Sequence, residues 1–145
     1  METANVKCLR EIYHSTRMLS SKYLKGQPVL FDDLRVHPMR NKEGELNWFE
    51  IGPGTKALRL PDEPGRLRFI KVSEKGGSIA EHEHPDCYEY LFLETGRILV
   101  NGFVMDPKEG HVFMEFEPGD SHRIDAPEAS KYIVIFSPKP LSFEY

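Results

Sequence analysis

The sequence has no long apolar run, few cysteines and no excess of one charge. No stretch approaches the roughly 18 apolar residues that span a bilayer, so we expect no membrane association. The 19 basic and 23 acidic residues give a formal net charge of -4, which argues against a nucleic-acid partner. Two cysteines, Cys8 and Cys87, do not make a disulfide framework. The opening METANVKCLREIYHS lacks the apolar centre of a signal peptide, so a cytoplasmic location is expected.

What is present suits one globular domain. A chain of 145 residues is close to the usual size of a single domain. The apolar fraction of 39% is modest, but 11% of the residues are aromatic, which supplies enough large side chains for a core.

The chain divides into an N-terminal part, residues 1–45, and a larger part, residues 46–145. Residues 5–24 carry apolar side chains at roughly helical spacing and are followed by Gly26 and Pro28, which predicts a helix that ends there. Residues 27–45 leave three interpretations open: an edge strand, a lid over the barrel mouth or a dimer arm.

Beyond residue 46 the apolar period changes to two, and turn residues recur about every ten positions. This pattern predicts an all-β, antiparallel sandwich or barrel, with the N-terminal helix packed on it. The expected strands are LNWFEI, TKALRL, LRFIKV, YEYLFLE, RILVNG, HVFMEFE and KYIVIFS.

The segment YEYLFLE, residues 88–94, is apolar on both faces. Glu89, Leu91 and Leu93 alternate with Tyr88, Tyr90 and Phe92. One of these two faces of the strand is expected to face the core, and the other must be covered by another part of the protein. The N-terminal helix can cover part of it, and a second subunit can cover the rest. A homodimer is therefore expected.

The stretch with most chemical information is GGSIAEHEHPDCYEYLFLETG, residues 76–96. His82 and His84 are two residues apart, so on an extended strand their imidazoles share a face. Glu89 follows after a short turn, and a hairpin of this length brings its carboxylate opposite the rings. Such a set binds first-row divalent metals well. A fourth ligand is expected from a distant strand, and His122, after the turn PGDS, is the natural candidate.

Other interpretations of these residues stay open. Two histidines at this spacing also occur as a polar stripe facing solvent. His14 and His37 have no partner at ligand spacing, whereas His111 begins an expected strand and is a weaker candidate. Cys87 is either a substrate or metal contact or an ordinary turn residue, which is the commoner case.

The spacing from Gly76 through His82, His84 and Glu89 to Gly96 resembles the first motif of the cupin superfamily. The resemblance implies a cupin-type jelly-roll β-barrel over about residues 46–138, with the two histidines and the glutamate as the first three metal ligands. It also implies a fourth ligand from a second motif with Pro and Gly before a His.

Pro118, Gly119 and His122 resemble that second motif in part. The Gly-to-His spacing fits, but Pro118 stands directly before the glycine, and Ala126 replaces a later Asn. The Trp48 segment, the PG turn and the histidine motif most resemble small bacterial cupins related to the sensory domain of zinc-binding anti-sigma factors.

Two classes of function are compatible with this pattern. The first is a metal-dependent enzyme acting on a small organic molecule, with one iron, manganese, nickel or zinc ion per chain. A dioxygenase-like oxidoreductase is favoured, and an isomerase or lyase is the alternative. The second is a metal- or ligand-binding or sensing module. An enzyme needs an acid or base beyond the ligands, and the nearby candidates are Tyr88, Tyr90 and His111.

Overall fold

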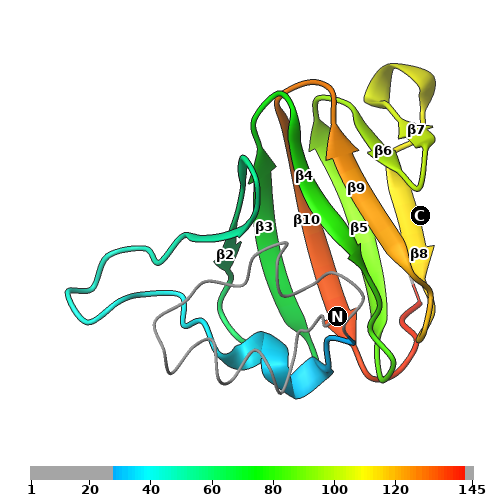
Figure 1. Cartoon of the computed structure of the whole chain (residues 1–145). Coiled ribbons are helices and arrows are strands. Elements are labelled where there is room, and N and C mark those ends of the chain that lie inside the picture. The colour runs from blue at the N-terminus through cyan, green and yellow to red at the C-terminus, as the bar shows by residue number, and fades with distance from the viewer. Residues whose placement is uncertain (1–27, 143–145) are drawn as a thin grey trace.

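The structure, a computed structural model, describes residues 28–142. The expected helix over 5–24 lies outside the described residues. Within them, two antiparallel sheets lie against each other, and short 3-10 turns are the only helical elements (Figure 1). No helix in this part of the chain is long and apolar enough to cross a membrane.

The larger sheet has six strands in the order β1-β2-β3-β10-β5-β8. The bounds are β1 Phe49–Gly52, β2 Thr55–Arg59, β3 Leu67–Ser73, β10 Ser130–Ser137, β5 Tyr88–Thr95 and β8 Phe113–Phe116. The smaller sheet has four strands in the order β4-β9-β6-β7. Its bounds are β4 Gly77–His82, β9 His122–Ala126, β6 Ile98–Val100 and β7 Phe103–Met105.

The seven segments expected to be extended each contain a strand, which confirms the all-β, jelly-roll-like class. The alternation is clearest in β3 and β10, where every second side chain is buried between the sheets. The core is formed by apolar residues from both sheets, with Leu91, Ile98, Ile124, Tyr132 and Val134 almost fully buried.

The segment 28–45, whose role the sequence left open, begins at one end of the sandwich, and after η1 its chain projects beyond β2 (Figure 1). Pro28 forms a parallel bridge with Glu83, and Val29 N–H donates to the Glu83 carbonyl at 2.9 Å. The 3-10 turn η1, Phe31–Arg35, follows and buries Phe31 and Leu34 in the core. The described part of the arm therefore closes the end of the sandwich at which the histidines lie.

The two sheets meet closely where β1 passes β4. A side chain on Gly52 would collide with the backbone carbonyl of Ser78, so only glycine permits this approach. Ser78 N–H donates to the Pro53 carbonyl at 2.9 Å, which ties the start of β4 to the β1–β2 turn.

Candidate metal centre

β4 and the residues after it present His82 and His84 to the interior. Ile79 is buried and Glu81 is exposed, so strict alternation is broken between them and His82. The pairing of β4 with β9 contains a register shift between Ile79 and His82. This β-bulge turns His82 inward, and His84 follows on the same face. Both imidazoles are buried, as the shared-face prediction requires.

Glu89 lies on β5, in the larger sheet, and faces the histidines across the interior. Its side chain is 1% exposed. In register it is flanked by Phe136 on β10 and Phe116 on β8. The carboxylate is thus held between aromatic side chains that keep water away from it.

His122 opens β9 and pairs directly with His82 across the smaller sheet. The turn before it contains Gly119, whose φ of +88° favours glycine. Gly119 N–H donates to the His84 carbonyl at 2.9 Å. The turn is therefore fastened to the first histidine segment, and this contact places the two sequence motifs side by side.

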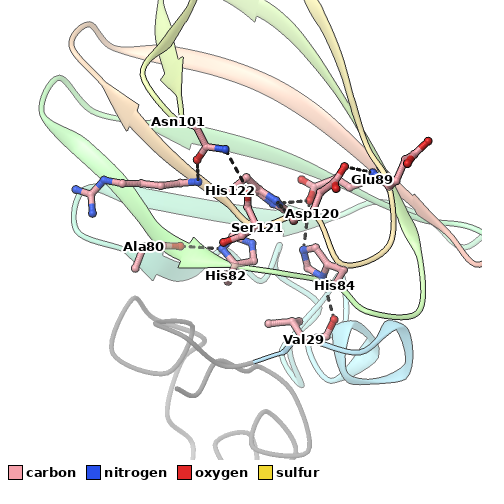
Figure 2. Close-up of polar contacts among 11 residues, drawn as sticks. Val29, Ala80, His82, His84, Glu89, Asn101, Asp120, Ser121 and His122 are labelled. Carbon is pink, nitrogen blue, oxygen red and sulfur yellow. Dashed lines mark hydrogen bonds and ion pairs between the residues drawn. The ribbon is translucent and has the colours of Figure 1, made fainter.

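The four side chains converge on one point (Figure 2). One potential ligand atom from each of His82, His84, Glu89 and His122 lies within 4.8 Å of all the others. Nε2 of His84 and of His122 lie 3.2 and 2.9 Å from Glu89 Oε1. The structure brings together the four residues that the sequence selected, and this cluster could hold a metal ion.

The other ring nitrogen of each histidine is held by a backbone carbonyl. Nδ1 of His82 lies 2.8 Å from the Ala80 oxygen, and Nδ1 of His122 lies 3.1 Å from that of Asp120. Nδ1 of His84 lies 2.9 Å from the Val29 oxygen. A carbonyl only accepts, so each Nδ1 carries the proton and each Nε2 presents a lone pair. Metal-binding histidines are usually oriented in this way.

The inward atoms make no hydrogen bond among residues 28–142. These buried atoms are Nε2 of His84, Nε2 of His122 and both carboxylate oxygens of Glu89. The short approaches of these nitrogens to Glu89 Oε1 do not have hydrogen-bond geometry. Buried polar atoms without hydrogen bonds are costly. A divalent cation would satisfy all of them at once, so this donor set fits a metal.

The electrostatics of the cluster favour deprotonated ligands. Burial lowers the pKa of His82 well below its usual value, and the nearby His122 and His84 lower it further. Burial likewise lowers the pKa of His84, against the opposing influence of Glu89. Burial alone would raise the pKa of Glu89, but the neighbouring His122, His84 and Lys71 hold it well below the ordinary range. Neutral imidazoles and a carboxylate are the forms that bind a metal.

A cavity adjoins the cluster on the side of His82 and His84. It encloses about 450 Å³ of empty space, its open mouth included. Most of the lining is apolar, with side chains from η1, β1, β2, β3 and β10. Three ionisable residues other than the histidine ligands contribute to it: Asp33, His37 and Lys71.

Several other residues considered from the sequence lie elsewhere. His111 is exposed and contacts Phe103, and Tyr88 and Tyr90 are not in the cavity lining. Cys87 is 1% exposed within the apolar core, where burial raises the pKa of its thiol. Phe69, on β3, lines the cavity.

Lys71 and His37 are cavity residues that the sequence interpretation missed. A signal for Lys71 was present, because it lies two residues after Phe69 in an alternating strand and shares its inward face. His37 carried no such signal, since it belongs to a segment without regular periodicity. Its ring stacks on Phe49 at 3.8 Å, and burial lowers its pKa to about 4.

Comparison with known proteins finds similarity in structure. No protein-family model matches the sequence, and no curated protein matches it. Among solved structures, KdgF from Halomonas sp. is 17% identical with a TM-score of 0.57, covering 71% of this chain and 94% of that one. A cupin superfamily sugar phosphate isomerase from Silicibacter pomeroyi is 20% identical with a TM-score of 0.52, covering 60% of this chain and 61% of that one.

A third solved structure, described as a predicted oxalate decarboxylase from Thermotoga maritima, is 15% identical. Its TM-score is 0.50, and the match covers 57% of this chain and 79% of that one. At these identities the likeness concerns the fold alone. The expected cupin-type fold is therefore confirmed at the level of architecture.

Proposed function

We propose that this protein is a metal-dependent enzyme of the cupin type that acts on a small organic molecule. One divalent transition metal ion, iron, manganese, nickel or zinc, is bound by His82, His84, Glu89 and His122. The observation that carries the proposal is the common orientation of the three imidazoles. Each Nδ1 is engaged by a carbonyl, and Nε2 of His84 and of His122 lies beside the Glu89 carboxylate.

The chain's own residues have three tasks at this centre. The carbonyls of Ala80, Val29 and Asp120 fix the imidazoles. The aromatic rings beside Glu89 exclude water, which strengthens electrostatic interactions there. The cavity next to His82 and His84 gives a small molecule access to the same point. A bound ion would supply a Lewis acid with positions open to substrate and, in the case of iron, to dioxygen.

Catalysis is favoured over storage or sensing by the ionisable residues in the cavity. An enzyme needs an acid or base beyond its ligands, and Lys71, His37 and Asp33 all line this cavity. The dioxygenase-like reaction that the sequence favours stays a prediction. The isomerase or lyase alternative likewise stays a prediction. The relationship to zinc-binding anti-sigma factors would correspond to the sensing alternative.

Metal analysis of untagged protein tests the proposal. We expect about one iron, manganese, nickel or zinc per chain, and its loss in His84→Ala. The matched control is His111→Ala, which removes an exposed imidazole outside the cluster and should retain the metal. A wild-type protein without metal, or metal retained by His84→Ala, would overturn the assignment.

The reaction class needs a second measurement on the metal-loaded protein. Oxygen consumption by the iron-loaded protein with small organic acids or ketones indicates a dioxygenase. Product formation without oxygen uptake indicates an isomerase or lyase. If the loaded protein binds small molecules but converts none of them, the binding or sensing module becomes the better interpretation.

The homodimer expected from the sequence also remains a proposal. On the outer side of β5 and β8, Phe92 packs on Phe113 with ring centroids 4.9 Å apart, and Phe113 is still 37% exposed. An exposed aromatic surface of this kind is typical of subunit contacts. Light scattering at several concentrations gives the mass directly.

A further inference from the structure

Lys71 is the unexplained residue of the cavity. Its side chain is on the inward face of β3 and only 7% exposed, although an ammonium group is costly to bury without a partner. In residues 28–142, no hydrogen bond or ion pair to Nζ is present. Nζ lies over the ring of Phe136, 5.7 Å from its centroid.

The neighbouring strands explain why no residue of 28–142 pairs with the Lys71 amine. In register it is paired with Ala57 on β2 and Tyr132 on β10. Ala57 has no polar group, and the Tyr132 hydroxyl is engaged with Ser73 Oγ at 3.2 Å. The Ser73 hydroxyl in turn meets that of Thr55 at 3.0 Å. The adjacent polar side chains thus interact with one another and leave the amine directed at the cavity.

Lys71 is on the metal-centre side of that cavity. Burial lowers the pKa of its amine, and the charge of Glu89 opposes that shift. Phe136 is paired with Glu89 in register and also contacts the His84 ring, with centroids 4.8 Å apart. The amine and the imidazoles therefore approach the same space across one aromatic ring. Asp33, the carboxylate in the lining, belongs to η1 and not to the strands that carry Lys71 and Phe136.

We propose that Lys71 is the anion-binding residue of this cavity and that the substrate is a small carboxylate. The ammonium donates hydrogen bonds to the carboxylate, and another oxygen of the same molecule reaches the metal centre. A cavity that is otherwise apolar favours a short carbon chain between the two groups. This inference rests on the proposed function, since it concerns the substrate of the same centre.

The binding mode predicts selectivity for charge as well as shape. A neutral compound of the same size cannot replace the carboxylate, because the buried amine would keep no anionic partner. Loss of a charge-assisted hydrogen bond weakens binding by roughly 10- to 100-fold. The effect should be confined to anionic compounds, whereas general damage to the cavity would weaken all of them alike.

The test measures binding of acetate, pyruvate and neutral acetamide by calorimetry, with metal-loaded and chelator-treated full-length protein. We expect wild type to bind the two anions more tightly than acetamide. Lys71→Met should lose that preference by about 10-fold or more, and Lys71→Arg should keep part of it. Lys56→Met, which alters an exposed lysine on β2, is the matched control and should behave as wild type.

Two results would overturn the inference. One is equal binding of anions and acetamide by wild type, and the other is an unchanged preference in Lys71→Met. Metal content is measured on the same samples, so the two proposals can fail separately. If metal is bound without anion preference, the inference alone fails. If no metal is bound but Lys71-dependent anion binding persists in the chelator-treated protein, the proposed function alone fails.

Discussion

Nδ1 of His84 donates a hydrogen bond to the carbonyl of Val29, 55 residues earlier in the chain, at 2.9 Å. Val29 is itself held by its own N–H, which donates to the Glu83 carbonyl at 2.9 Å. The arm and the first histidine segment thus position each other. One consequence is that the arm takes part in orienting a candidate ligand and does more than cover the end of the sheets.

This contact predicts that two roles of His84 are separable. In His84→Asn the side-chain amide can still donate to the Val29 carbonyl, but no atom occupies the position of Nε2. We expect loss of metal with little change in the unfolding free energy of the metal-free protein. In His84→Leu the buried carbonyl loses its partner, which costs about 1–3 kcal/mol. Urea unfolding with chelator present measures both variants, and equal stabilities would contradict the orienting role of Val29.

A second prediction concerns Cys87, for which the sequence allowed a role in the site. The thiol is in the apolar core, and burial raises its pKa, so the reactive thiolate is scarce. With Cys8 replaced by Ser, we expect native protein to resist a thiol reagent and unfolded protein to react fully. Cys87→Ala should retain the metal. Rapid labelling of the native protein, or metal loss in Cys87→Ala, would indicate that Cys87 takes part in the site.

A third prediction separates two effects of replacing Gly119, the cost in stability of its positive φ and the loss of metal binding. Gly119→Ala places a side chain at a φ of +88°, which costs about 1–2 kcal/mol. It should also disturb the turn that brings His122 to His84 and so weaken metal binding. Gly65→Ala is the matched control, with a φ of +71° and open space around the added carbon. Both variants should lose similar stability, as thermal unfolding without metal would show, but only Gly119→Ala should lose metal affinity.

Local pattern was sufficient to predict much of this fold. Two-residue alternation locates β3, β5 and β10 because each has one face buried between the sheets. The strands β4, β7 and β9 are not among the seven expected segments, since short segments give too little periodicity. Residues 5–24, expected to be helical, lie outside the described part of the chain.

The four candidate ligands were selected by spacing, and the structure brings them together. The arrangement that makes this possible was not predictable from the same pattern. Strict alternation from Ile79 would direct Glu81 inward. Because of the bulge before His82, Glu81 is exposed and His82 is buried. The carbonyls that orient the imidazoles come from the backbone, so no residue type reveals them. The inward position of Lys71, by contrast, is predictable from the sequence, because Lys71 lies two residues after Phe69 in the same alternating strand.

The final prediction concerns His37, whose buried ring stacks on Phe49. Burial lowers its pKa from 6.5 to about 4, so between these values the unfolded chain binds a proton that the folded chain does not. The stability that depends on neutral His37 is therefore complete above pH 6.5 and is lost as the pH falls towards 4. The full effect is about 3 kcal/mol, from 1.36 kcal/mol per pKa unit.

The variant His37→Phe tests this prediction, because it keeps an aromatic ring on Phe49 and removes the titrating group. Unfolding free energies of chelator-treated proteins should therefore fall more steeply with acid in wild type than in His37→Phe. Parallel pH profiles would mean that the ring is protonated in the folded state or that it is exposed.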